Sequence, residues 1–231
     1  MIYITGDQHG RVKEIFEFTE RFHTSKEDIL IILGDAGFNY WEDSRDDRVK
    51  AFLQKLPITL FCIHGNHEKR PYDIPSYHTT EFCGGTAYVE DEYPNIFFAI
   101  DGEVYRFNDL DCMAIGGAYS VDKFFRITMG YKWFSNEQPG WDIKKWIEEQ
   151  LENRNHKIDV ILSHTCPSSV EPVEMYLPQI SQNMVDKSTE EWLQKIESKT
   201  DYTKWYCGHW HTDKTDGKFR FMYHDFEEFI Q

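Results

Sequence analysis

The stretch Thr59-Leu60-Phe61-Cys62-Ile63-His64-Gly65-Asn66-His67-Glu68 joins a short apolar run to a glycine and a group of polar side chains. An apolar run without polar alternation is typical of a strand that is buried on both faces. Gly65 lets the backbone turn sharply where this strand ends. Because ligands in open α/β sheets bind beyond the carboxyl ends of the strands, we expect the polar residues after Gly65 to lie at a functional site.

Four other stretches of the chain repeat this pattern of a buried strand followed by polar residues. The residues that follow these strands are Asp7-x-His9, Gly34-Asp35, His164 after Ser163, and Gly208-His209-x-His211. Two segments between the first three strands, Arg11 to about Phe22 and Asp46 to Lys55, have apolar residues at helical spacing. Alternating strands and helices predict right-handed crossovers and a largely parallel sheet, so that the strand ends meet at one edge.

The rhythm of the chain changes after residue 86. From Thr86 to Ile115 short strands and tight turns predict antiparallel hairpins, in a second sheet or at an edge of the first. Residues 141–153 predict an amphipathic helix, and the irregular segment 168–188 could form a loop over a site. No repeat or linker composition interrupts the chain, so we expect a single domain over residues 1–231.

Composition limits the classes of function. The chain of 231 residues has 40 acidic and 25 basic residues, for a net charge of −15, which disfavours binding to long nucleic acid. No apolar run approaches the ~18 residues of a membrane span. The five cysteines form no C-x-x-C pair, which indicates reduced thiols and a cytoplasmic protein. If the substrate is an anion, a bound metal is the obvious source of local positive charge.

The five strand ends together offer two aspartates, one asparagine and up to five histidines. Each of them alone is explained as well by a turn or a structural role, but their repetition after buried strands favours a shared site. Imidazole nitrogen with carboxylate and amide oxygen suits Mn, Fe or Zn better than Ca or Mg. The set exceeds what one ion needs, so we expect two metal ions, about 3.5–4 Å apart and bridged by a carboxylate.

These five blocks, in this order, resemble the signature of the calcineurin-like metallophosphoesterases, and the resemblance runs from residue 5 to residue 211. It implies an α/β fold in which two mixed β-sheets pack as a sandwich flanked by helices. It also implies two divalent, or one divalent and one trivalent, metal ions, with Mn preferred. By position, the implied ligands are Asp7, His9 and His211 for one ion, Asn66, His164 and His209 for the other, and Asp35 bridging both. His67 matches the family's non-ligand histidine, a candidate catalytic proton donor.

After Gly34-Asp35 the sequence departs from the protein Ser/Thr phosphatase branch of this family. That branch continues with Asp-Arg-Gly, whereas this chain continues with Ala36-Gly37-Phe38. The aspartate that orients the catalytic histidine and the arginine that binds phosphate are therefore missing from that place, and protein phosphatase activity is disfavoured. Arg126 and Lys123 are candidate substrate-binding residues that could replace the arginine, with solvated loop charges as the alternative.

Three residues beside the predicted ligands need separate interpretation. His64 precedes Gly65 and could face the site or the core, and we expect it near the substrate. Cys166 and Cys207 lie close in sequence to predicted ligand histidines. Because adjacent residues of a strand point to opposite faces, we expect the two cysteines to pack in the core.

The resulting functional hypothesis is metal-dependent hydrolysis of a phosphate ester by a metal-bridging hydroxide. The expected substrate is a small soluble phosphomonoester or phosphodiester, with nucleotide-type esters included. One alternative is a non-catalytic metal-binding scaffold that acts through a partner, and another is a nuclease acting on short oligonucleotides. No membrane partner is expected, and the sequence leaves the native metal pair and the oligomeric state open.

Overall fold

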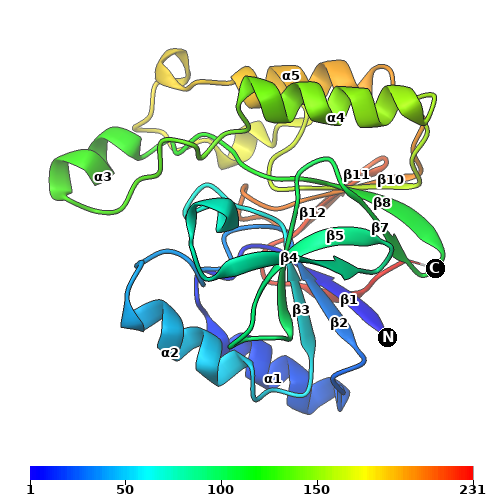
Figure 1. Ribbon diagram of the computed structural model, residues 1–231. Helices are drawn as coiled ribbons and strands as arrows, with labels where there is room; N and C mark the ends of the chain where they lie inside the picture. The colour runs from blue at the N-terminus through cyan, green and yellow to red at the C-terminus, as the bar shows by residue number, and fades with distance from the viewer. Residues whose placement is uncertain (231) are drawn as a thin grey trace.

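The computed structural model describes residues 1–230 of the chain and has four layers. Two β-sheets pack face to face, α1 (Val12–Phe22) and α2 (Ser44–Leu53) cover the outer face of the first sheet, and α4 (Trp141–Asn153) and α5 (Ser188–Glu197) cover the outer face of the second (Figure 1). This arrangement confirms the predicted fold class, a sandwich of two mixed sheets flanked by helices.

The first sheet has a parallel centre and antiparallel edges. Its strands, in order across the sheet, are β13 (Phe226–Glu228), β1 (Ile2–Thr5), β2 (Ile29–Ile32), β3 (Thr59–Cys62), β6 (Ile96–Ala99), β5 (Gly85–Glu90) and β4 (Tyr77–Phe82). Strands β1, β2, β3 and β6 run parallel, while β13 pairs antiparallel with β1 and β5 pairs antiparallel with β6. The sequence did not predict β4 or β13, because their half-exposed residues lack a continuous apolar run.

The second sheet is built in the same way. Its strands, in order, are β11 (Lys214–Asp216), β12 (Phe219–Phe221), β10 (Lys204–Cys207), β9 (Val160–Ser163), β8 (Leu110–Ile115) and β7 (Val104–Phe107). Strands β12, β10, β9 and β8 run parallel, and β7 and β11 are antiparallel edges. The segment predicted as antiparallel hairpins is therefore divided, since β5 and β6 join the first sheet whereas β7 and β8 join the second.

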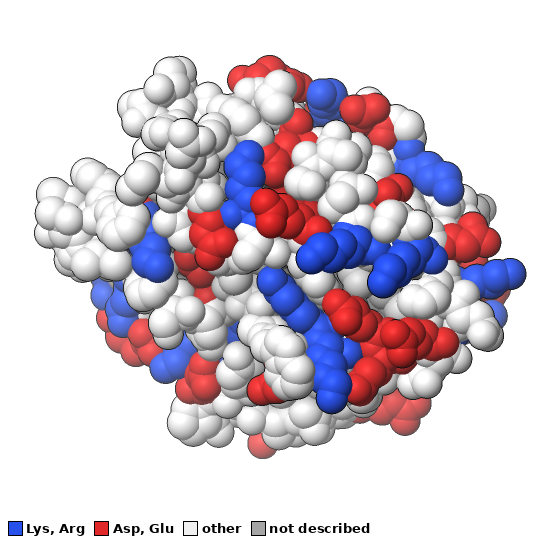
Figure 2. Space-filling model, turned by 90° about the horizontal axis from the view of Figure 1, so that it is seen from above, with Lys and Arg blue, Asp and Glu red and all other residues white. Residues whose placement is uncertain are grey.

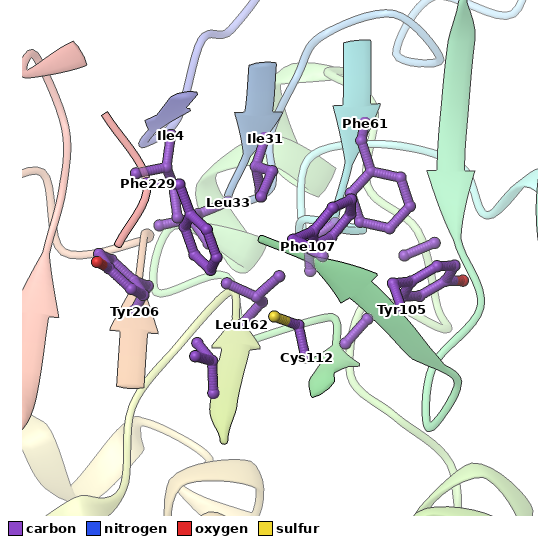
Figure 3. Close-up of a cluster of buried hydrophobic side chains, with 14 of the residues drawn as sticks. Ile4, Ile31, Leu33, Phe61, Tyr105, Phe107, Cys112, Leu162, Tyr206 and Phe229 are labelled. Atoms are coloured by element: carbon purple, nitrogen blue, oxygen red, sulfur yellow. The ribbon is translucent and has the colours of Figure 1, made fainter. Parts of the chain in front are cut away.

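Strand β3 explains why the central strands read as unbroken apolar runs. Leu60 and Cys62 pack against the layer of α1 and α2, whereas Phe61 and Ile63 pack between the two sheets. Figure 3 shows this inner core, where Phe61 of the first sheet meets aromatic side chains of the second sheet, Tyr105 among them. Each central strand thus buries both of its faces, which leaves no position for the usual polar alternation.

Short helices shape the surface above the carboxyl ends of the strands. Helix α3 (Lys123–Met129) follows β8 and buries none of its residues. The segment 168–188, predicted as irregular, contains three 3-10 turns, η2 (Ser168–Val170), η3 (Val173–Met175) and η4 (Gln182–Met184). A fourth turn, η1 (Pro71–Asp73), follows β3. Figure 2 shows uncharged surface gathered where α3 projects, while acidic and basic side chains alternate over the rest of that face.

Among residues 1–230, none of the helices combines the length and the hydrophobicity that crossing a bilayer requires.

Candidate metal centre and substrate cavity

The loop after β1 and the loop after β10 bring together Asp7, His9 and His211. His211 Nε2 lies 3.2 Å from Asp7 Oδ2, and His9 Nε2 lies 3.8 Å from the same oxygen. The two Nε2 atoms are 3.1 Å apart. Asp7 is buried, and its other oxygen, Oδ1, accepts a hydrogen bond of 2.8 Å from His209 N–H. The free face of the carboxylate therefore turns toward the two imidazoles.

A second group joins Asn66, His164 and His209 from the loops after β3, β9 and β10. Asn66 Oδ1 lies 2.8 Å from His164 Nε2 and 3.0 Å from His209 Nδ1. Asn66 Nδ2 donates to Ser120 Oγ at 2.9 Å, which orients the amide so that its oxygen faces the histidines. The Nδ1 of His164 lies 2.8 Å from the Leu33 carbonyl, so we assign the ring proton to Nδ1 and leave Nε2 as an acceptor.

Asp35 lies between the two groups. Its Oδ2 is 3.9 Å from His9 Nδ1 and 3.8 Å from His164 Nε2, so one oxygen faces a member of each group. Its Oδ1 accepts a hydrogen bond of 2.7 Å from His67 N–H, which fixes the carboxylate. A carboxylate in this position is placed to bridge two ions.

The donor atoms fit bound metal ions better than they fit one another. His164 Nε2 and Asn66 Oδ1 are both acceptors, and two acceptors facing each other at 2.8 Å repel unless a cation lies beside them. Asp7 Oδ2 is buried and has no hydrogen bond of acceptable geometry among the described residues. The groups Asp7, His9 and His211, and Asp7, Asp35 and His164, each keep their donor atoms within 4.8 Å of one another. Nitrogen and oxygen donors of this kind suit Mn, Fe or Zn.

Glycines at the strand ends let these side chains approach the backbone. A Cβ on Gly65 would lie 2.1 Å from Asp35 Oδ1, and a Cβ on Gly208 would lie 2.4 Å from Asp7 Oδ1. A Cβ on Gly34 would lie 2.1 Å from His164 Nδ1. These positions therefore require glycine, which explains the glycine that precedes the polar residues in the sequence.

Backbone strain gathers at the same loops. Four of the predicted ligands have a left-handed backbone: His9 (φ 46°), Asp35 (φ 45°), His209 (φ 65°) and His211 (φ 49°). This conformation is uncommon for residues other than glycine and costs of order 1–3 kcal/mol where it is strained. The fold maintains it at residues whose side chains converge on one point, a pattern that accompanies functional sites.

Electrostatics keeps the two carboxylates and His209 in the protonation states that a cation needs. Burial opposes ionisation of Asp7, but the facing imidazoles, His211 first among them, lower its pKa below the usual value. The pKa of Asp35 is also lowered, because nearby histidines outweigh the opposing effect of burial. Burial, together with the neighbouring His164, lowers the pKa of His209 to about 3. The carboxylates are therefore anionic and His209 is neutral at neutral pH.

His67 lies beside this cluster, close to Arg126. Arg126 Nη2 approaches His67 Nε2 at 3.3 Å, and its Nη1 approaches Tyr40 Oη at 3.3 Å. Arg126 Nε donates to both carboxylate oxygens of Asp122 at 2.8 Å, which holds the guanidinium in place. Burial lowers the pKa of His67, with the charge of Arg126 acting in the same direction and that of Asp35 opposing it. Of the two basic residues proposed from the sequence, Arg126 is the one that contacts a residue of the predicted site, through His67.

Lys123 does not reach it. Its Nζ lies 4.2 Å from the centre of the Trp133 ring, and neither Lys123 nor Arg126 lines the cavity beside the predicted metal ligands. The ammonium is therefore directed to an aromatic face by a cation–π contact.

His64 does not face the predicted site either. It is buried and lines a separate cavity of about 230 Å³ together with Arg70 and Asp101. Its backbone carbonyl accepts a hydrogen bond of 2.8 Å from Gly117 N–H, which fixes the residue against the loop after β8. His64 therefore lies apart from the cavity beside the predicted metal ligands, and its contact with substrate stays a prediction.

A cavity of about 310 Å³ opens beside the predicted metal ligands. Asp35, Asn66, His67, His209 and His211 form one wall. The opposite wall comes mainly from the segment 171–190, including Met175, Tyr176, Leu177, Ile180 and Val185. The segment that was predicted to cover a site therefore lines this cavity. Cys166 and Cys207 pack in the core as expected and take no part in it.

A sequence model of the calcineurin-like phosphoesterases matches residues 1–213. The chain belongs to this family. Membership supports hydrolysis of phosphoesters in general, and the family typically binds metal ions, which agrees with the Asp and His groups that could hold one. None of the curated proteins compared with the chain matches it.

Two solved structures are distantly similar to the chain. A protein of unknown function from Aquifex aeolicus is 14% identical, and the match covers 71% of this chain and 77% of that one, with a TM-score of 0.35. Phosphopantetheinyl hydrolase from Mycobacterium tuberculosis is 15% identical, and the match covers 96% of this chain and 87% of that one, with a TM-score of 0.46. At these values neither structure informs the choice of substrate.

Sequence reasoning missed four contributors to the site. Ser120 follows β8 and the Gly116-Gly117 turn, so the pattern of a strand, a glycine and a polar residue could have found it. Asp122, which holds Arg126, lies in a loop with no such signal. Glu171 and Glu190 line the cavity, but in the sequence they are two acidic residues among 40.

Proposed function

We propose that this chain is a phosphatase or phosphodiesterase that hydrolyses a small soluble phosphate ester with two bound metal ions, Mn being the preferred one. The observation that carries the proposal is the position of Asp35, whose Oδ2 faces His9 of one donor group and His164 of the other. The proposed ligands are those implied by the family resemblance: Asp7, His9 and His211, then Asn66, His164 and His209, with Asp35 shared.

Metal ions bound there would activate water as a nucleophile and neutralise charge on the phosphate. The seven ligand residues would hold the ions, and the glycines beneath them would keep the ligands in position. Arg126 would bind a phosphate oxygen, in the role left open by the missing arginine of the Ser/Thr phosphatase pattern. Its guanidinium is already fixed by Asp122, so little side-chain entropy is lost on binding.

His67 would donate the proton that the leaving group needs. In the reaction a bond forms between the water oxygen and phosphorus, the ester P–O bond breaks, and the departing oxygen takes a proton from His67. The pKa of His67 is lowered in the free protein by burial and by Arg126. A bound phosphate places negative charge beside the imidazole and raises this pKa, so the histidine gains its proton as the substrate arrives.

Two observations support an enzyme over the alternatives. A scaffold has no need for strained backbone at four ligand positions beside an open cavity. A nuclease for long strands needs a continuous basic surface, whereas acidic and basic side chains are mixed over the face shown in Figure 2.

Elemental analysis paired with hydrolysis tests the proposal. Purified protein loaded with Mn should hold close to two ions per chain and should hydrolyse para-nitrophenyl phosphate or its bis ester. The preferred ester distinguishes a monoesterase from a diesterase. The variant Asp35→Asn should lose both metal and turnover. Its matched control is the same change at an exposed aspartate, Asp91→Asn, which should keep both. Protein that retains no metal after incubation with Mn would contradict the proposal.

A further inference from the structure

The wall of the cavity opposite the metal ligands holds charged groups that the proposed reaction does not use. Glu171, Lys187 and Glu190 all line the cavity. They lie on the segment that runs from η2 into α5, and within residues 1–230 only Glu190 of the three accepts a hydrogen bond from a loop that carries a predicted metal ligand, through Thr165 beside His164. A cavity wall that needs only to exclude water has no reason to bury carboxylates, because burying a charge is costly.

Glu171 and Lys187 form a fixed ion pair. Lys187 Nζ lies 2.6 Å from Glu171 Oε2, and it also donates to Tyr176 Oη at 2.8 Å. Tyr176 Oη donates in turn to Glu171 Oε2. The Glu171 side chain is 4% exposed, yet its second oxygen, Oε1, has no hydrogen-bond partner among the described residues.

Glu190 is a second buried carboxylate, and it has no cation paired with it. Its Oε1 accepts a hydrogen bond of 2.9 Å from Thr165 Oγ1, while Oε2 is buried without a partner among residues 1–230. The residue is 5% exposed and forms no ion pair in the described part of the chain. The wall therefore carries two unused acceptor oxygens and, when both carboxyl groups are ionised against one ammonium, an excess of one negative charge.

The rest of the wall is apolar. Met175, Leu177, Ile180 and Val185 line the cavity beside Tyr176. Trp210, which separates two metal ligands, stands next to Tyr176 with ring centres 5.9 Å apart. The cavity thus places apolar and aromatic side chains in the same wall as the two carboxylates.

From these contacts we propose that Glu171 and Glu190 form a subsite for a positively charged amine on the leaving group of the substrate. The preferred substrate is then a phosphate ester whose leaving group has an apolar or aromatic body and ends in an ammonium. The ammonium would supply donors to the two unpartnered oxygens and balance the unpaired charge of Glu190. This inference rests on the proposed phosphoesterase function and specifies the substrate class of the same site.

The test compares two esters of equal shape. The amine ester is 4-(2-aminoethyl)phenyl phosphate, and its uncharged counterpart is 4-propylphenyl phosphate. The Mn-loaded protein should show a higher kcat/KM for the amine ester, by about tenfold or more. Equal values, with para-nitrophenyl phosphate turned over, would overturn the subsite and leave the proposed function standing.

Three variants test which groups carry the preference. Glu190→Gln removes the unpaired charge at nearly constant shape and should bring the ratio of the two kcat/KM values close to one. Lys187→Gln removes the competing cation, so it should increase the ratio. The exposed Glu174, in the same segment, pairs with Lys214 away from the cavity, and Glu174→Gln should leave the ratio and the basal turnover unchanged. A ratio that fails to respond to Glu190→Gln and Lys187→Gln in opposite directions contradicts the proposal.

Calorimetry separates this inference from the hydrolysis itself. The leaving groups 4-(2-aminoethyl)phenol and 4-propylphenol can be titrated into metal-loaded protein without any turnover. Tighter binding of the amine supports the subsite even if no ester is hydrolysed, in which case the proposed function alone fails. Equal binding of the two phenols overturns the subsite.

Discussion

The two walls of the cavity are built on different principles. The metal-ligand wall consists of loops at the ends of β1, β2, β3, β9 and β10. A Cβ added to Gly34, Gly65 or Gly208 in these loops would lie 2.1–2.4 Å from an atom of a proposed ligand residue. The opposite wall comes mainly from the segment 171–190, which contains 3-10 turns and the start of α5 and has exposed side chains such as Met175 and Leu177. The first wall has almost no freedom to change, whereas the second is open to substitution.

This difference separates chemistry from specificity. A reaction at phosphorus requires donors held within tenths of an ångström, and strand ends of a packed sandwich provide that rigidity. Recognition of a leaving group requires only complementary charge and shape, which a surface segment can supply. Changes to the metal-ligand wall should therefore affect every ester equally, and changes to the opposite wall should affect the choice among esters.

The largest expected effect comes from His67. In His67→Gln the proton donor is lost while the seven proposed ligands remain, so kcat should fall by about 10²–10⁴-fold. Steady-state kinetics with para-nitrophenyl phosphate and elemental analysis measure both quantities. His78→Gln, a change at an exposed histidine, is the matched control. Retention of full kcat would contradict the assignment of His67 as the proton donor and the placement of the chemistry in the metal-ligand wall.

Arg126→Ala should lower kcat/KM by a smaller factor. A hydrogen bond to a charged group contributes about 1.5–3 kcal/mol, which corresponds to a loss of about 10–100-fold. The loss should be similar for charged and uncharged leaving groups, since the arginine would bind the phosphate. The exposed Arg106→Ala, whose partner Asp109 lies on a turn, serves as control. A loss limited to one leaving group would mean that Arg126 recognises the leaving group and not the phosphate.

Packing offers a third test, on stability. Gly65→Ala inserts a methyl group 2.1 Å from the backbone nitrogen of Asp35 and should lower the free energy of unfolding by about 1–3 kcal/mol. Leu177→Ala, in the opposite wall, should cost about 0.5 kcal/mol or less because the side chain is half exposed. Urea denaturation measures both, with Gly140→Ala as a control because nothing lies within 4 Å of its Cβ position. Equal costs in the two walls would contradict the proposed difference in rigidity.

The smallest effect is expected from Glu190 and depends on pH. Burial raises the pKa of Glu190 to about 7, with the charge of Glu171 acting in the same direction and that of Lys187 opposing it. A raised carboxyl pKa stabilises the fold at low pH, and this stability is lost as pH rises from about 4.5 through 7. Glu190→Gln should therefore raise Tm at pH 8 by about 2–4 °C, the equivalent of about 1 kcal/mol, and by less at pH 5.

Thermal unfolding of wild type and variant at each pH measures this effect. Lys144 also interacts with Glu190, and it is left unchanged in both proteins. A variant that is less stable than wild type at pH 8 would mean that the Glu190 carboxylate stabilises the free protein. That result would contradict the inference that the charge of Glu190 is unpaired.

The residues at the strand ends were predictable because packing requires an apolar run and the site requires a glycine at its end, and both are visible in the sequence. A strand buried on both faces is a continuous apolar run, and a ligand that approaches the backbone needs a glycine, so Asp35 and Asn66 could be found from their neighbours. The positions of Arg126 and His64 were not predictable in this way. Arg126 depends on where α3 projects and on Asp122, and His64 on a hydrogen bond from a loop about 50 residues away.

The opposite wall has no comparable pattern in the sequence. Glu171 and Glu190 meet only because the segment between them folds back through Tyr176 and Lys187, and no periodicity encodes that path. Edge strands were missed for a related reason. Strand β13 pairs with β1 through its backbone, so its side chains are free to be polar.

The pairing of β1 with β13 has a consequence for biosynthesis. Asp7 and His209 are 202 residues apart, and β13 follows later still. At ribosomal rates of about 5–20 residues per second, the interval between them is on the order of 10–40 s. Throughout that interval the nascent chain displays an unpaired β1 edge and an incomplete set of ligands. Under the proposed function, metal ions would therefore bind late in the synthesis of the polypeptide, and until then the unpaired edge of β1 is a place where nascent chains can associate.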